Sequence, residues 1–178
     1  MTRHCLVLGG ARSGKTAFAE RLALHAGAKP AYLATATVLD AEMNERVSSH
    51  QAVRGERFTT IEEPLELSHA ILKAGKAHDV ILVDCLTLWI TNLLLANEDV
   101  ATAVSELYAT LAEIQQAKVI LVSNEVGLGI VPDNAMARTF RDLAGSTHQR
   151  LAEICDDVYF VAAGLPLTLK GNAPDPVS

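Results

Sequence analysis

The sequence predicts a three-layer α/β domain built around a mostly parallel sheet. Short apolar runs alternate with longer amphipathic runs along the 178 residues, as expected for strands connected by helices. The short runs are almost continuously apolar, which is typical of parallel strands that helices cover on both faces. A glycine-rich segment directly follows the first apolar run, where a strand would lead into a helix.

The predicted strands are rich in β-branched residues and leucine. In order they are His4–Leu8, Ala31–Thr35, Val80–Asp84, Lys118–Ser123 and Val158–Ala162, with Phe58–Ile61 as a weaker candidate. The predicted helices have amphipathic spacing and lie between these strands. They are Lys15–Ala26, Ala41–Arg54, Pro64–Ala74, Leu86–Ala96, Val100–Gln116 and Ala135–Cys155.

Residues with known end preferences flank several of these helices. Gly27 and Gly75 directly follow two of them, and Pro64 suits the first position of a third. Three further residues stand where helix N-caps belong, namely Asp40, Asp99 and Asn134.

The length of the chain fits one domain with a substantial core. A protein of 178 residues and 19.0 kDa buries close to ~70% of its unfolded surface. Apolar residues make up 49% and charged residues 20%, which argues against disorder. We expect residues 1–170 to form a single domain and residues 171–178, which are rich in proline and turn formers, to form a flexible tail.

Charge and hydropathy exclude several classes of partner. Fifteen Lys and Arg against 21 Asp and Glu give a net charge of −6, which disfavours nucleic acid as a partner. The longest apolar stretch, Val80–Ala96, is interrupted by Asp84 and Asn92, and a membrane span needs about 20 apolar residues. The cysteines form no Cys-x-x-Cys pair and predict reduced thiols in a cytoplasmic protein; they are Cys5, Cys85 and Cys155.

The glycine-rich segment has the pattern of a phosphate-binding loop. Its residues are Gly9, Gly10, Ala11, Arg12, Ser13, Gly14, Lys15 and Thr16. Glycines let backbone N–H groups surround an anion, and the following helix presents its positive end. Lys15 would reach the β- and γ-phosphates, and the Thr16 hydroxyl would bind Mg²⁺. A chance glycine loop is the alternative, but the preceding strand and following helix favour nucleotide binding.

Asp84 ends an apolar strand and is the second candidate metal ligand. A carboxylate at this point can hold Mg²⁺ beside the phosphate loop, although an aspartate at a turn or helix cap is commoner in general. The residues after Asp84 do not form Asp-x-x-Gly, and the chain contains no Asn-Lys-x-Asp. A GTPase conformational switch is therefore disfavoured.

A histidine in the predicted helix Ala41–Arg54 is a candidate nucleophile. His50 has Arg46 and Arg54 one helical turn away on either side. A lone helical histidine is usually structural, but flanking arginines would favour a neutral imidazole. The arginines fall into two blocks whose role, solvated surface or ligand contact, stays open at this point; they are Arg46, Arg54 and Arg57, and Arg138, Arg141 and Arg150.

Together these motifs resemble the bifunctional adenosylcobinamide kinase / adenosylcobinamide-phosphate guanylyltransferase family of cobalamin biosynthesis. The resemblance covers about residues 4–170 and is most specific in the blocks around His50 and at Asn124–Pro132. Further matching segments are Gly9–Thr16, Tyr32–Ala36, Thr60-x-Glu62, and Asp84–Trp89 with Asn92. Beyond Pro132 the match continues at single positions, namely Arg138, Phe140, Arg141, Asp142, Ala144, Gly145, Gln149, Arg150 and Leu151. Ser49 departs from members that carry a second histidine there, so His50 is the histidine of this block.

The resemblance implies a RecA-like P-loop NTPase fold and two reactions. ATP or GTP would phosphorylate adenosylcobinamide, and GTP would then form a GMP-histidine intermediate whose GMP passes to the new phosphate. By this resemblance His50 is the nucleophile, and the nucleotide contacts beyond Gly9–Thr16 are Thr35, Ala36, Thr37, Gln51, Ala52, Val53, Arg54, Glu62 and Asp84. The resemblance also implies a homo-oligomer, with a trimer as the first expectation.

Two other functions use the same phosphate loop. A P-loop small-molecule kinase would use the loop and Asp84 but not His50, so GTP would leave no nucleotide on the protein. A nucleotide-sensing module would bind nucleotide without turnover, and the missing switch motifs count against it.

Overall fold

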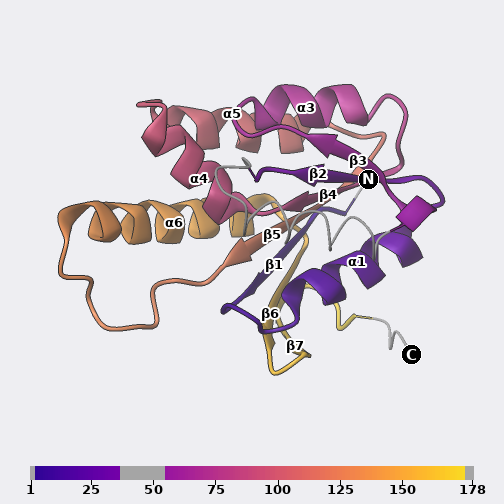
Figure 1. Ribbon diagram of the computed structural model, residues 1–178. Coiled ribbons are helices and arrows are strands. Elements are labelled where there is room, and N and C mark those ends of the chain that lie inside the picture. Colours follow the sequence, from indigo (N-terminus) through magenta and orange to yellow (C-terminus); the bar gives the residue numbers. More distant parts are fainter. Residues whose placement is uncertain (1–2, 37–54, 175–178) are drawn as a thin grey trace.

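The computed structural model describes residues 3–36 and 55–174, which form a twisted sheet covered by helices on both faces (Figure 1). The strands are β1 (Cys5–Gly9), β2 (Pro30–Ala34), β3 (Thr59–Glu62), β4 (Val80–Asp84), β5 (Lys118–Asn124), β6 (Asp157–Ala162) and β7 (Leu165–Lys170). The helices are α1 (Lys15–Ala26), α3 (Leu67–Ala74), α4 (Leu86–Leu95), α5 (Val100–Glu113) and α6 (Ala135–Ile154), with a 3-10 turn at Gly55–Arg57.

The order of the strands brings together the parts of the chain that carry motifs. The seven-stranded sheet has the order β3-β2-β4-β5-β1-β6-β7. Neighbouring strands pair in parallel except β6 and β7, which form an antiparallel hairpin. The carboxyl ends of β1, β4 and β5 therefore meet at one edge, with β5 between the other two. Ligands of open α/β sheets bind at this edge.

Two apolar layers hold the sheet between the helices. Successive side chains of a strand point to opposite faces, so Val80 and Leu82 pack toward α1 while Ile81 and Val83 pack toward α3, α4, α5 and α6. Figure 1 shows α1 on one side of the sheet and these four helices on the other. Strands buried on both faces explain why the apolar runs are nearly continuous.

All five strongly predicted strands and the weaker one are present, but the sequence prediction missed β7. Its leucines alternate with other residues and are largely exposed, at 69% for Leu165, 58% for Leu167 and 61% for Leu169. The strand lies at the edge of the sheet, so it has no continuous apolar run to mark it. The turn before it, Ala163–Gly164, has positive φ at both residues, as a tight hairpin requires.

One predicted helix start was wrong. The helix expected from Pro64 begins at Leu67, because the segment before it forms a turn. The Glu63 carboxylate accepts hydrogen bonds from the N–H groups of Leu65 at 3.0 Å and Glu66 at 2.9 Å. The predicted end of α5 was also late by three residues. The caps predicted at Asp99 and Asn134 are confirmed, since their side chains accept from Ala101 N and Ala137 N.

Three further predictions concern the helix Ala41–Arg54, membrane spans and the cysteines. The predicted helix Ala41–Arg54 and its cap Asp40 lie outside the described residues. Among the residues that are described, no helix combines the length and apolar character of a membrane span. The three cysteines are buried free thiols, and burial raises the pKa of Cys155 to about 12.

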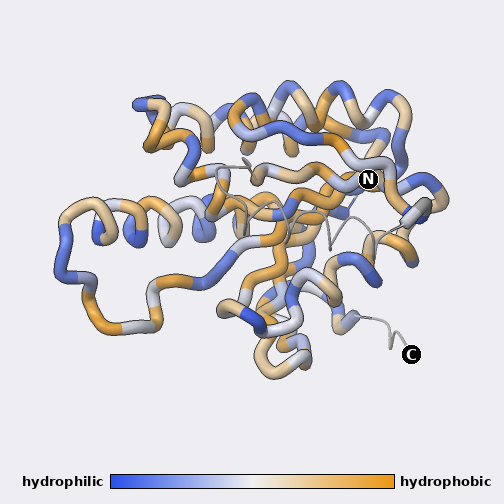
Figure 2. The backbone as a smooth tube through the Cα atoms, in the orientation of Figure 1, coloured by the Kyte–Doolittle hydropathy of each residue, from blue (hydrophilic) through white to orange (hydrophobic). Residues whose placement is uncertain are grey.

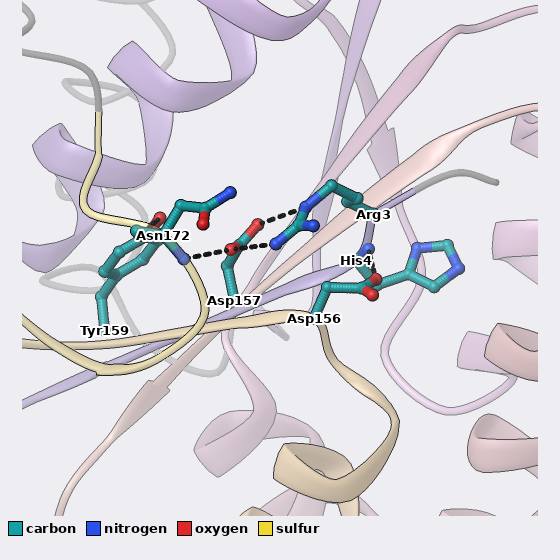
Figure 3. Close-up of polar contacts among 6 residues, drawn as sticks. All are labelled: Arg3, His4, Asp156, Asp157, Tyr159 and Asn172. Atoms are coloured by element: carbon teal, nitrogen blue, oxygen red, sulfur yellow. Dashed lines mark hydrogen bonds and ion pairs between the residues drawn. The ribbon is translucent and has the colours of Figure 1, made fainter.

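A polar cluster joins the start of the chain to its C-terminal hairpin (Figure 3). Arg3 forms an ion pair with Asp157 at 2.8 Å, and the same carboxylate accepts from the N–H of Asn172 at 3.1 Å. The Tyr159 hydroxyl donates to the carbonyl of Asn172 at 2.9 Å. Burial acts to raise the pKa of Asp157, but the hydrogen bonds from Arg3 and Asn172 outweigh it and hold that pKa below its usual range. Asn172, in the segment predicted as a tail, is thus tied to β6.

Candidate nucleotide-binding site

The phosphate loop connects β1 to α1 and has the backbone that its glycines predict. Gly14 has a φ of 91°, and a Cβ atom there would lie 3.0 Å from the Cα of Gly164. The N–H of Gly164 donates to the Ser13 carbonyl at 2.7 Å, so the β6–β7 turn is hydrogen-bonded to the loop. The Ser13 hydroxyl is buried and, within the described part of the chain, has no hydrogen-bond partner. An unpaired buried hydroxyl in this loop is consistent with a ligand-binding role.

Lys15 lies at the end of the loop, where α1 begins. Its side chain is 8% exposed, and its ammonium donates to the Gly10 carbonyl at 3.0 Å. Burial lowers the pKa of Lys15, while the nearby Asp84 carboxylate opposes this shift. The loop therefore holds a partly desolvated cation against its own backbone at the Gly10 carbonyl. A cation beside a glycine-rich loop is suited to a phosphate group.

Asp84 is the meeting point of three elements. Its Oδ2 atom accepts a hydrogen bond from the Thr16 hydroxyl at 3.0 Å and one from the Tyr32 hydroxyl at 2.7 Å. Thr16 is the second residue of α1, Tyr32 lies in β2, and Asp84 ends β4. The structure thus brings together the two residues that the sequence predicted as metal ligands.

These oxygen atoms fit a magnesium site of the kind found beside nucleotides. Mg²⁺ is usually held by one or two carboxylates together with the phosphates of the substrate. Among residues 3–36 and 55–174 there is no cluster of three or more His, Cys, Asp or Glu side chains that would hold a metal without a nucleotide. A hydroxyl and a carboxylate beside the phosphate loop are the donor set that Mg²⁺ prefers.

Tyr32 was not among the predicted site residues. Its ring packs edge-on against Phe58 with centroids 6.0 Å apart, which fixes its direction. The parallel register pairs Ala34 with Asp84, so Tyr32, two residues earlier, points to the same face of the sheet as Ala34. A tyrosine in an otherwise apolar strand was the signal in the sequence that Tyr32 could have a polar role. Its hydrogen bond to Asp84 depends on the pairing of β2 with β4, which the sequence does not specify.

Thr35 ties the end of β2 to the residue after Asp84. Its buried hydroxyl donates to the Cys85 carbonyl at 2.7 Å and accepts from the Cys85 N–H at 2.9 Å. The Asn92 amide donates to the carbonyls of Thr35 at 2.8 Å and Pro64 at 3.1 Å. The hydrogen bonds to Cys85 and Asn92 fix the position of Thr35, the residue that directly follows β2. Thr35 and its neighbour Ala36 remain predicted nucleotide contacts.

Glu62 lies far from the phosphate loop. It ends β3, which is four strand spacings from β1, or about 19 Å at 4.8 Å per spacing. Its side chain is exposed at the same edge of the sheet as Asp84. If Glu62 contacts a nucleotide, this position suits the ribose or base rather than the phosphates bound by Gly9–Thr16.

Several predicted site residues lie outside the described residues, namely Thr37, His50, Gln51, Ala52, Val53 and Arg54, together with Arg46. The described residue before this segment, Ala36, follows Thr35, whose N–H donates to the Asp84 carbonyl at 3.2 Å. The chain thus enters the segment that carries His50 from the edge of the sheet where the phosphate loop lies.

The second arginine block makes contacts within the protein. The Arg138 guanidinium donates to the carbonyls of Pro132 at 2.9 Å and Asp133 at 2.8 Å. Arg141 pairs with Asp142 at 2.9 Å, and Arg150 lies 5.4 Å from the centre of the Tyr108 ring. These contacts favour a structural role over phosphate binding for this block.

The fold and the site define a P-loop NTPase with RecA-like architecture. The RadB recombinase has a TM-score of 0.50 at 19% identity, covering 89% of this chain and 73% of that chain. A type III secretion system ATPase of pathogenic bacteria has a TM-score of 0.53 at 12% identity, covering 93% of this chain and 56% of that chain. At such identities the likeness shows the fold alone.

Within this class the chain belongs to the cobinamide kinase / cobinamide phosphate guanyltransferase family, which matches residues 5–169. A relative from Pseudomonas aeruginosa, the bifunctional adenosylcobalamin biosynthesis protein CobP, is 46% identical over 94% of this chain and 97% of its own length. The corresponding CobU proteins are 41% identical in Salmonella typhimurium and 38% in Escherichia coli, each covering 93% of this chain and 98% of the relative. The family membership expected from the motifs is confirmed.

Proposed function

We propose that this protein catalyses two consecutive reactions on a corrinoid. The first phosphorylates the aminopropanol hydroxyl of adenosylcobinamide with ATP or GTP, and the second transfers GMP from GTP to the new phosphate. The observation that carries the proposal is the family match across residues 5–169. The hydrogen bond from the Thr16 hydroxyl, at the end of the phosphate loop, to the Asp84 carboxylate supports it. Near-complete coverage of bifunctional relatives supports both activities.

In the kinase step, the residues of the loop position the nucleotide. The N–H groups of Gly9–Thr16 and the Lys15 ammonium bind its β- and γ-phosphates. The acceptor hydroxyl oxygen attacks the γ-phosphorus, the bond to the bridging oxygen breaks, the nucleoside diphosphate leaves, and the hydroxyl proton passes to water. Positioning and charge stabilisation carry most of the catalysis in reactions of this kind.

Magnesium is the cofactor that this arrangement suits. Thr16 and Asp84 would hold it, and when bound it neutralises charge on the β- and γ-phosphate oxygens. Tyr32 and Thr16 both donate to one oxygen of Asp84. Those two hydrogen bonds orient the carboxylate toward the loop.

In the guanylyltransferase step, His50 is the proposed nucleophile. Its imidazole nitrogen attacks the α-phosphorus of GTP, and pyrophosphate leaves. A phosphate oxygen of adenosylcobinamide phosphate then attacks the same phosphorus, breaking the P–N bond and giving adenosylcobinamide-GDP. Gln51–Arg54 and Thr37 belong to the same proposal as nucleotide contacts. We further propose a cytoplasmic homo-oligomer, with a trimer as the first form to test.

Incubation with adenosylcobinamide and GTP, followed by mass analysis of the corrinoid, tests the proposal. We expect adenosylcobinamide phosphate first and adenosylcobinamide-GDP later. A product that stops at the phosphate would favour the small-molecule kinase. Nucleotide binding with an unchanged corrinoid would favour the sensing module and contradict both activities.

A further inference from the structure

A pocket of about 340 Å³ opens directly beside the phosphate loop. Four elements border it, because β5 lies between β1 and β4 and is followed by the loop that leads to α6. Its lining includes Ala11 of the phosphate loop, Thr87 and Thr91 of α4, Asn124 and Glu125 at the end of β5, and Phe140 of α6.

The polar groups of this pocket are held in fixed directions. The Asn124 amide donates to the Thr87 hydroxyl at 2.8 Å. The Glu125 carboxylate accepts from the N–H groups of Gly127 at 2.6 Å and Leu128 at 3.2 Å. The Glu125 N–H donates to the Gly9 carbonyl at 3.0 Å, which joins this wall to the phosphate loop. A hydroxyl group entering the pocket would therefore meet oriented oxygen acceptors close to the phosphate loop.

The loop beside the pocket exposes large apolar side chains. Leu128 is 81% exposed, Ile130 is 97% exposed and Val131 is 63% exposed, while Met136 at the start of α6 is 69% exposed. Figure 1 shows this loop extending away from the sheet between β5 and α6, and Figure 2 shows apolar stretches along it. The Arg138 bonds to the carbonyls of residues 132 and 133 hold the end of the loop.

The size and charge of the pocket limit what it can hold. Pockets for small ligands range over about 300–1,000 Å³, so this one has room for a side arm but not for a macrocycle. Among the described residues that line it, none is Lys or Arg, and Glu125 would repel a second polyphosphate. The pocket is thus better suited to a neutral hydroxyl-bearing group than to another nucleotide.

We infer that this pocket is the acceptor subsite: it takes the hydroxyl-bearing arm of the corrinoid, while the exposed loop Leu128–Val131 packs against the body of the macrocycle. The inference rests on the proposed function, because that function supplies a large acceptor with one reactive arm. It assigns the acceptor a place at the carboxyl end of β5, between the phosphate loop that follows β1 and the helix α4 that follows β4.

A substitution that fills the pocket tests the inference. Thr91→Phe places a bulky ring in the subsite, and Ser105→Phe on α5 is the matched control. Both hydroxyls donate to the carbonyl four residues earlier, at 2.9 Å for Thr91 and 2.8 Å for Ser105, but Ser105 does not line the pocket. We expect Thr91→Phe to raise the KM for adenosylcobinamide in the kinase step about tenfold or more, with the Kd of a fluorescent GTP analogue unchanged. Ser105→Phe should match wild type in both.

A second variant protects the test against a folding defect. Ile130→Ser changes an exposed loop residue, so the fold should tolerate the substitution. We expect the KM for adenosylcobinamide to rise about threefold, because apolar contact with the corrinoid is lost. The sedimentation coefficient should stay constant. If wild type phosphorylates adenosylcobinamide but neither variant changes its KM, the subsite inference is wrong. If Ile130→Ser alters sedimentation and not KM, the loop is a subunit contact and its assignment to the acceptor is wrong. If wild type itself yields no phosphorylated corrinoid, the proposed function fails first.

Discussion

A single carboxylate oxygen connects the parts of the nucleotide site at the scale of residues. Asp84 Oδ2 accepts from Thr16 and from Tyr32, so the start of α1 and the middle of β2 both determine where it points. Hydrogen bonds to metal ligands orient them and commonly change metal affinity or activity by about 10–100-fold when lost. The contribution of Tyr32 is therefore measurable separately from that of Asp84.

Replacing Tyr32 with Phe should weaken magnesium binding while keeping the fold. The ring contact with Phe58 survives, and only the hydroxyl that donates to Asp84 is lost. We expect the Mg²⁺ concentration for half-maximal kinase rate to rise about tenfold, and Mn²⁺ binding in the presence of nucleotide, followed by electron paramagnetic resonance, to weaken in parallel. Asp84→Asn should show a larger effect. Unchanged metal titrations in Tyr32→Phe would mean that Thr16 alone suffices to orient the carboxylate.

Replacing His50 with Ala should separate the two activities. Wild type incubated with α-labelled GTP should carry label through a P–N bond that is stable in base and labile in acid, and γ-labelled GTP should leave none. His50→Ala should lose the label and the transfer of GMP but retain phosphorylation of adenosylcobinamide. Lys15→Ala, as a control, should lose both steps by on the order of 10²–10³ in rate. Label on the His50→Ala protein would place the nucleophile elsewhere.

At the scale of elements, the parallel strands were predictable and the edge hairpin was not. A strand covered on both faces needs a continuous apolar run, and β4 and β5 supply one; β7 is exposed on the edge and has none. The phosphate loop was predictable because its chemistry depends on local spacing. Tyr32 and the wall formed by Asn124 and Thr87 were not, because they depend on which strands become neighbours.

The stability of the protein should depend on Asp157, which ties the hairpin β6–β7 to the start of the chain. Its carboxylate binds both Arg3 and the N–H of Asn172, and Asp157→Asn removes the charge from both interactions. We expect the free energy of unfolding in urea to fall by about 1–2 kcal/mol. Asp142→Asn, which breaks a more exposed pair with Arg141, is the control and should leave the urea midpoint near that of wild type. Equal effects of the two substitutions would argue against a stabilising role for the cluster in Figure 3.

At the scale of the whole molecule, stability should depend on pH through two buried histidines. His4 accepts from the Val119 N–H at 3.1 Å and lies 3.0 Å from the Leu111 carbonyl, while His148 lies 2.7 Å from the Ser123 hydroxyl. Burial lowers the pKa of His4 and of His148. As the pH falls below about 6.5, the unfolded chain therefore binds protons that the folded chain does not, and stability decreases.

Urea denaturation between pH 8 and pH 5 checks this dependence. Wild type should lose stability progressively below about pH 6.5. His4→Asn should be less stable at pH 8 but should lose less on acidification, because one buried titrating group is gone. His25→Asn, a change at an exposed position of α1, should keep the wild-type slope. A slope unaffected by His4→Asn would assign the acid sensitivity to other groups.

The place of β1 in the sheet has a consequence for how the protein is made. The strand that begins the nucleotide site pairs with β5 and β6, and the loop after it is hydrogen-bonded to Gly164, so both sheet partners of β1 come from the second half of the chain. On the ribosome, at about 5–20 residues per second, roughly 7–30 seconds separate the synthesis of Thr16 from that of Gly164. During that time the nascent chain has no complete phosphate site, so cellular ATP and GTP stabilise only the finished protein.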